Sequence, residues 1–217
     1  MRIDCRRFRC TVLGLALLAY SLCAAGAALL DDLIVAVRNE RVDEVKALLA
    51  RGMDPDSVDR QGEPMLCIAA RNGDVATVNA LLAARAKVDL PNAYGDTPLM
   101  LSALSGNLDT VEALHAHGAA VNRAGWTPLI YAATGGHDRI VSFLIAHAAN
   151  IDATAPNGTS ALMMAIREHH RETARLLIDE GADVNHRNVD GATALSWALR
   201  GDESEIAEEL RRAGARD

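Results

Sequence analysis

Residues 95–107 have the sequence Gly-Asp-Thr-Pro-Leu-Met-Leu-Ser-Ala-Leu-Ser-Gly-Asn, and looser copies of this segment recur to the end of the chain. In each copy a glycine precedes an apolar run, and successive glycines are 33, 30, 33 and 33 residues apart. The marker glycines are Gly62, Gly95, Gly125, Gly158 and Gly191. A nearly constant period of this length indicates one supersecondary unit repeated along the chain.

The copy Gly125-Trp-Thr-Pro-Leu-Ile-Tyr-Ala-Ala and the later segment Gly181-Ala-Asp-Val-Asn resemble the ankyrin repeat. That family combines Gly-x-Thr-Pro-Leu-His-x-Ala-Ala with Leu-Leu-x-x-Gly-Ala-Asp-Val-Asn at the same period. The resemblance covers about residues 29–217 and implies an all-α solenoid of stacked helix-turn-helix units with short finger-like hairpin loops. We expect six units, of which the first and last cap the stack: 29–59, 60–92, 93–122, 123–155, 156–188 and 189–217.

Two helices per unit follow from the local chemistry. Thr97-Pro98 and Thr127-Pro128 are good helix starts, because a threonine oxygen caps free backbone N–H groups and proline tolerates the first helical position. Small residues recur at one position of the inner helix and leucines at another, which predicts close stacking around a shared core. The small residues are Ala69, Ser102, Ala132, Ala165 and Ala198, and the leucines are Leu66, Leu99, Leu129, Leu162 and Leu195.

The repeat pattern is broken in two ways. Arg85 and Ala148 stand where other units have a glycine after the outer helix, so we expect those two helices to end either with backbone strain or in a different turn, at a cost of about 1 kcal/mol each. Three residues are missing between Val121 and Gly125, which predicts one shortened finger. Trp197 aligns with Ile68, Leu101, Tyr131 and Met164, and we therefore expect it in the core.

The N-terminal segment differs from everything that follows. Four arginines in the first nine residues precede an apolar run and then small residues near Gly26, which is the layout of a signal peptide spanning residues 1–26. The alternative is an uncleaved anchor, because Thr11 to Leu30 contains no charge and approaches the roughly 20 residues of a membrane span. Both alternatives predict export, with residues 27–217 periplasmic or secreted.

Charge and cysteine content narrow the function classes. The chain has 22 basic and 29 acidic residues, and removal of residues 1–26 leaves 18 and 28, a net charge of −10. This balance disfavours a nucleic-acid partner, since phosphate binding depends on basic surfaces. Cys67 is the one cysteine outside the N-terminal segment, and its place in an apolar helix predicts a buried, inert thiol.

Catalytic and metal sites have little support in the sequence. There is no glycine-rich phosphate loop, nucleophile elbow or HExxH motif, so we expect neither an enzyme nor a cofactor. A metal site using His115, His117 and His147 is the alternative, but no cysteine or carboxylate completes the ligand set. His137 matches the turn between helices, and His169-His170 replaces that turn in the fifth unit, where we expect both rings to be solvated.

The resemblance implies a partner surface formed by the finger tips and the exposed side of the inner helices. Tyrosine, tryptophan and arginine tend to dominate the energy of such surfaces. On that basis we predict a protein-binding site formed by Arg60, Arg71, Tyr94, Leu104, Arg123, Trp126 and Arg167. The competing interpretation of Trp126 is that its ring fills the space left by the shortened finger.

The sequence therefore predicts a non-catalytic protein-binding module that is monomeric and has no membrane contact once the signal peptide is cleaved. One alternative is an inhibitor or immunity-type protein that occludes a toxin or enzyme. Purely structural assembly through self-association is another alternative. The resemblance is to small exported bacterial ankyrin proteins.

Overall fold

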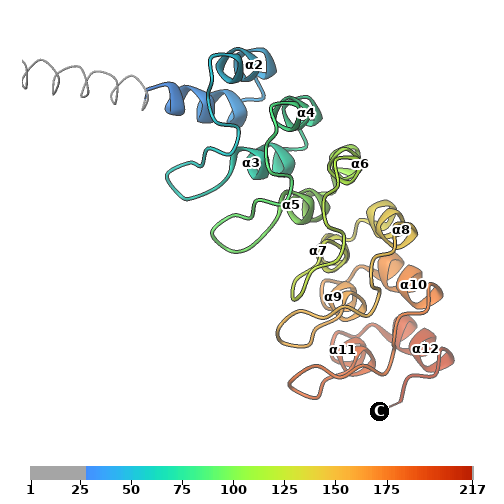
Figure 1. Ribbon diagram of the computed structural model, residues 1–217. Coiled ribbons are helices and arrows are strands. Elements are labelled where there is room, and N and C mark those ends of the chain that lie inside the picture. The colour runs from blue at the N-terminus through green and yellow to red at the C-terminus, as the bar shows by residue number, and fades with distance from the viewer. Residues whose placement is uncertain (1–27, 217) are drawn as a thin grey trace, which may run out of the picture.

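The computed structural model describes residues 28–216 and shows twelve helices there, stacked as six pairs into a curved solenoid (Figure 1). The predicted all-α solenoid is thus confirmed, whereas the predicted signal peptide, residues 1–26, lies outside the described residues. Among residues 28–216, no helix has the length and hydropathy that a membrane span requires. Inner helices pack on inner helices and outer helices on outer ones along the stack.

The first pair is a helix over residues 28–38 with α2 (Val42–Ala50). The others are α3 (Met65–Asn72) with α4 (Val75–Ala83), α5 (Pro98–Ser105) with α6 (Leu108–Ala116), α7 (Pro128–Gly135) with α8 (Asp138–Ala146), α9 (Ala161–Arg167) with α10 (Arg171–Asp179), and α11 (Ala194–Arg200) with α12 (Ser204–Arg212).

Hydroxyl side chains begin four of the inner helices. Each accepts a hydrogen bond from the backbone N–H three residues further on, as Thr97 does from Met100. The capping residues are Thr97, Thr127, Ser160 and Thr193. The predicted helix starts are therefore confirmed, and each cap contributes about 1 kcal/mol to helix stability.

The two predicted rows form the interior of the stack. All five small residues and all five leucines are buried, with at most 2% of any leucine exposed. Burying a large apolar side chain contributes about 1.5 to 3 kcal/mol. Small side chains next to these leucines allow neighbouring inner helices to approach closely, so each unit depends on its neighbours for its core.

In the fourth unit, the turn between the inner and outer helices requires a glycine at position 136 for two reasons. Its φ is +70°, and a Cβ there would lie 2.4 Å from Nδ1 of His170, which comes from the next unit. The Nε2–H of that histidine donates to the carbonyl oxygen of Thr134 over 3.0 Å. In the same way, Nε2 of His137 donates to the carbonyl oxygen of Leu104 over 2.9 Å, which confirms the predicted structural role of His137.

His169 is exposed, as predicted, whereas His170 is half-buried, so the prediction of a solvated ring is wrong for His170 alone. His170 binds the preceding unit through Thr134, and Nδ1 of His169 lies 2.8 Å from Oε1 of Glu203 in the following unit. The sequence pattern could not show this, because both partners belong to other units and lie more than 30 residues away.

Left-handed residues follow the outer helices, so of the two outcomes expected at Arg85 and Ala148 the strained one is found. Gly52, Gly118, Gly181 and Gly214 have positive φ after the outer helices. Arg85 has φ +69° and Ala148 φ +61° at the equivalent positions, so both non-glycine residues adopt the left-handed conformation at a steric cost.

Three of the full-length fingers are tight hairpins braced at their base by the side chain of Asp59, Asn92 or Asn188. In the third unit, Oδ1 of the buried Asn92 accepts the backbone N–H groups of Tyr94 and Asp96, and Asn188 binds Asp190 and Ala192 in the same way. Such side-chain to backbone bonds hold the loop in one conformation. The finger tips are therefore preordered by the bonds at their base.

The fourth unit lacks this brace. Asn122 instead binds the next unit, donating through Nδ2 to the carbonyl oxygen of Ala148 and accepting from the backbone N–H of Asn150. The chain then turns at Gly125, and the ring of Trp126 follows directly.

Candidate interaction surface

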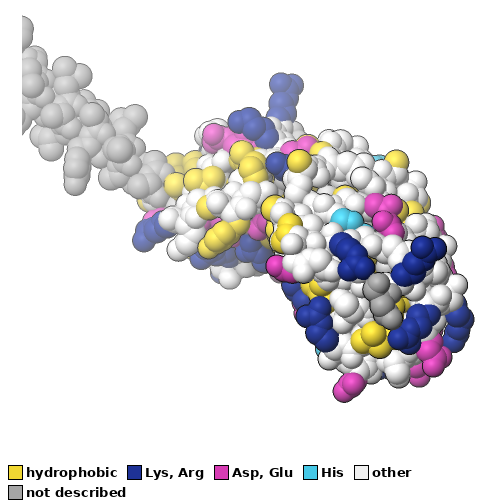
Figure 2. Space-filling model, turned by 90° about the horizontal axis from the view of Figure 1, so that it is seen from below, with side chains coloured by type: hydrophobic (Ala, Val, Ile, Leu, Met, Phe, Trp, Pro, Cys, Tyr) yellow, Lys and Arg dark blue, Asp and Glu magenta, His cyan; other side chains and the backbone are white. Residues whose placement is uncertain are grey.

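The fingers extend from the ends of the inner helices along one side of the solenoid (Figure 1). Seen from below, hydrophobic side chains group over the N-terminal half, and several lysine and arginine side chains lie over the C-terminal half (Figure 2). A surface that presents both kinds of side chain on rigid elements suits contact with another macromolecule.

Tyr94 is the most exposed large hydrophobic residue among those described, with 90% of its surface accessible. It lies at the tip of the finger that belongs to the third unit and is braced by Asn92. Leu104, on α5 of the same unit, is 37% exposed. Aromatic side chains that offer large area from a rigid loop are the usual anchors of protein interfaces. Both residues are thus accessible, as predicted from the repeat pattern.

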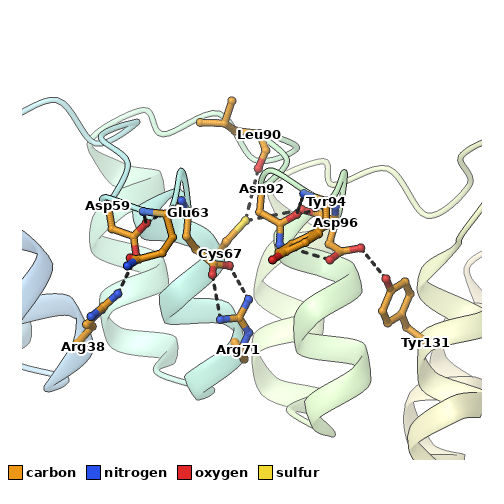
Figure 3. Close-up of polar contacts among 11 residues, drawn as sticks. Arg38, Asp59, Glu63, Cys67, Arg71, Leu90, Asn92, Tyr94, Asp96 and Tyr131 are labelled. Atoms are coloured by element: carbon orange, nitrogen blue, oxygen red, sulfur yellow. Dashed lines mark hydrogen bonds and ion pairs between the residues drawn. The ribbon is translucent and has the colours of Figure 1, made fainter.

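Trp126 is half-buried and packs against Tyr131, with ring centroids 5.6 Å apart. The Tyr131 hydroxyl in turn donates to Oδ1 of Asp96 over 2.5 Å (Figure 3). Burial, that hydrogen bond and the charge of Asp96 together raise the pKa of Tyr131 above its ordinary range. Trp126 is therefore placed both to cover the shortened finger and to offer its outer edge as contact surface.

The four predicted arginines differ in how far they are already engaged. Arg71 is held by both carboxylate oxygens of Glu63, at 3.1 and 2.5 Å (Figure 3). Arg60 makes only a 3.3 Å contact with an exposed carboxylate, that of Asp31. Arg123 forms no ion pair with any residue in 28–216, and Arg167 is paired with the neighbouring Glu168 at 2.8 Å.

The four arginines are therefore not equivalent. Tyr94 and Leu104 are exposed and Trp126 is partly buried, whereas Arg71 is already held by Glu63. An arginine that is already paired has less to offer a partner, because the existing ion pair must first be broken.

Cys67 is fully buried, and its thiol faces the backbone oxygens of Leu90 and Asp96 (Figure 3). Burial raises its pKa to about 12. The predicted inert thiol is confirmed as buried, and a thiol with this pKa carries almost no thiolate at neutral pH.

The three histidines of the metal alternative lie on outer helices. The rings of His115 and His147 are 4.3 Å apart between centroids, and each packs against Phe143. His117 and His147 bind carbonyl oxygens of their own helices, at 2.9 and 2.7 Å. Across residues 28–216 no three histidine, cysteine or acidic side chains come together as a metal site.

One surface feature was not predicted from the sequence. Trp197, predicted in the core, is only half-buried, and it lines a pocket with Arg167 and Arg200. Its alignment with smaller core residues was correct, but an indole ring is too large for the space that Ile68 or Met164 fills, so part of it extends outward. The size difference between Trp and its aligned residues was the available signal.

Comparison with known proteins agrees with this architecture. The family model described as "Ankyrin repeats (3 copies)" matches residues 33–124, 66–155, 122–188 and 150–216. The crystal structure of the human ASB11 ankyrin repeat domain is similar with a TM-score of 0.78 at 28% identity, over 85% of this chain and 84% of that one. No curated protein is significantly similar in sequence. The chain belongs to the ankyrin repeat family, whose repeats are generally protein–protein interaction modules.

Proposed function

We propose that this protein is a non-catalytic binding module whose finger side recognises one protein partner, with Tyr94, Leu104 and Trp126 as its central anchors. The observation that carries the proposal is Tyr94, which is 90% exposed at the tip of a finger that Asn92 holds in place. A rigid loop loses little conformational entropy on binding, so an exposed aromatic ring on it contributes most of its buried area to affinity.

The proposal extends to location. The arrangement of arginines, apolar run and small residues in the first 26 residues supports export to the periplasm or beyond, in the manner of small exported bacterial ankyrin proteins. Fractionation of a bacterial host, with mass spectrometry of the N-terminus, tests it. A mature N-terminus near residue 27 in the periplasmic fraction supports export. Full-length protein confined to the cytoplasm contradicts it.

Binding is tested by affinity capture from a periplasmic extract, run with the wild-type protein and the Tyr94→Ala, Trp126→Ala double variant. Val189→Ala is the matched control, because Val189 is also an exposed finger residue, at 71%, but belongs to the last unit. We expect one stoichiometric protein that the wild type and the control retain and the double variant loses. Circular dichroism establishes that all three proteins are folded.

Two results would count against this surface. Equal retention by the wild type and the double variant would show that the partner binds elsewhere. A Trp126→Ala variant that is strongly destabilised, yet binds with unchanged affinity in its folded fraction, would assign that ring to packing alone.

A further inference from the structure

A pocket of about 330 Å3 lies between the inner helices of the last two units and shares Arg167 with the predicted site. It is formed where α9 and α11 end. Its lining consists of two apolar residues, two arginines, a histidine and a glycine: Ile166, Trp197, Arg167, Arg200, His169 and Gly201. Basic and aromatic side chains therefore share one concave site in a protein whose net charge is −7.

The polar groups around the pocket are hydrogen-bond donors. The Arg167 guanidinium lies over the Trp197 ring, 6.0 Å from its centroid. Arg200 donates only to its own helix, to the carbonyl and hydroxyl oxygens of Ser196 at 3.2 and 3.3 Å. No carboxylate in residues 28–216 pairs with Arg200.

An equivalent arginine in another unit shows which group such a guanidinium binds. Arg71 occupies the position in α3 that Arg200 occupies in α11, and it is held in a two-bond pair by Glu63, the residue after the finger glycine. The last unit has Ala192 at the position of Glu63, so its arginine has no internal carboxylate. In the fifth unit Thr159 stands there.

The acidic side chains next to the pocket are all paired with residues other than Arg200. Glu168 pairs with Arg167 at 2.8 Å, and the buried Glu203 is paired with both Arg171 and His169. The positive charge of Arg200 is the one without a counterpart, and a planar guanidinium prefers a carboxylate in a two-bond arrangement.

We propose that this pocket, with Arg200 as its anion-binding group, receives an acidic side chain of the protein partner, which takes the place that Glu63 has at Arg71. An apolar residue next to the acidic one would pack on Trp197. The inference rests on the proposed function, since it names the chemistry of the segment that the same side of the molecule binds.

The test uses the full chain and a capped peptide, acetyl-Gly-Ser-Leu-Glu-Leu-Ser-Gly-amide, beside the same peptide with Gln for Glu. Binding is followed by the indole N–H resonance of Trp197 in two-dimensional nitrogen–proton spectra, assigned with Trp197→Phe. We expect a saturable shift with the Glu peptide and an affinity at least ~10-fold lower with the Gln peptide, the effect of losing a charge-assisted pair.

Variants separate the pocket from general electrostatics. Arg200→Gln should reduce binding of the Glu peptide to the level of the Gln peptide. Ala192→Glu should do the same with every basic residue retained, because it supplies the missing carboxylate within the chain. Arg211→Gln removes an arginine of the outer helix α12 that likewise has no ion-pair partner among residues 28–216, and it should leave the affinity unchanged.

Equal affinity for the Glu and Gln peptides, or no saturable shift of Trp197, would overturn the inference. So would equal losses in Arg200→Gln and Arg211→Gln. A Gln peptide with a free C-terminus that binds as tightly as the capped Glu peptide would also overturn it, by showing that the pocket reads a chain end.

Failure here can be told apart from failure of the proposed function. If Trp197 does not respond but capture still depends on Tyr94, only the pocket assignment falls. If Trp197 responds but no protein depends on Tyr94 for capture, the pocket stands and the central surface is wrong.

Discussion

The hydroxyl of Tyr131 donates to Oδ1 of Asp96 over 2.5 Å and so joins the inner helix of the fourth unit to the finger of the third. Replacing Tyr131 by Phe removes this hydrogen bond to a charged, partly buried group. We expect the free energy of unfolding to fall by about 1.5 to 3 kcal/mol, measured by urea denaturation. Tyr94→Phe is the control and should be neutral, because Tyr94 is almost fully exposed.

The same pair predicts a dependence on alkaline pH. Because the pKa of Tyr131 is raised in the folded state, its contribution to stability is fully present below the unfolded value of about 10 and is lost as pH rises above it. Tyr131→Phe should lack this part of the alkaline decline. Parallel curves for the two proteins between about pH 9.5 and 11 would contradict the assignment.

Glu203 is 5% exposed and pairs with Arg171 and His169. Burial alone would raise its pKa, but the hydrogen bonds from His169 and Arg171 outweigh burial and hold the pKa below the ordinary value. Glu203→Gln should lower the free energy of unfolding by about 1.5 to 3 kcal/mol at neutral pH. Glu205→Gln, which changes an exposed glutamate of the same helix, should cost less than about 0.5 kcal/mol.

The sign of the acid effect follows from the lowered pKa. The contribution of Glu203 is present above the unfolded glutamate value of about 4.3 and is lost as pH falls through the lower folded value. The stability difference between wild type and Glu203→Gln should therefore shrink in thermal unfolding below about pH 4. A constant difference down to about pH 3 would show that the carboxylate charge is not what stabilises the turn.

Ala148 has φ +61° after α8, whereas Ala146 is the last residue of that helix. Glycine at position 148 relieves the left-handed strain, so Ala148→Gly should stabilise the protein by up to about 1 kcal/mol. Ala146→Gly adds backbone freedom inside the helix and should destabilise it by roughly 0.5 to 1 kcal/mol. Opposite signs in urea denaturation are the expected outcome, and equal signs would argue against a strained turn.

Cys67 is buried and its pKa is raised to about 12. In a variant with serine at Cys5, Cys10 and Cys23, a thiol-reactive dye should label the native protein only as fast as the chain opens. The denatured chain should react at the rate of a free cysteine. Fast labelling of the native protein at neutral pH would show an accessible thiolate.

The sequence by itself determined the helices, their caps and their core. The burial of Leu66 and its equivalents and the threonine caps follow from local chemistry that the chain repeats at a fixed period. At Arg85 and Ala148 the sequence predicted an irregular helix end, and the structure shows that both residues are left-handed. The exposure of Tyr94 followed from the same register, because its place in the unit fixes the side on which it lies.

Only the tertiary structure decided which side chains meet across units. His170 binds Thr134, and Trp197 extends outward into a pocket beside Arg167. These contacts depend on the offset between stacked units and on the size of side chains that the pattern treats as equivalent. The repeat specifies the position of a residue within its unit, whereas its partners are set by the three-dimensional packing of the neighbouring units.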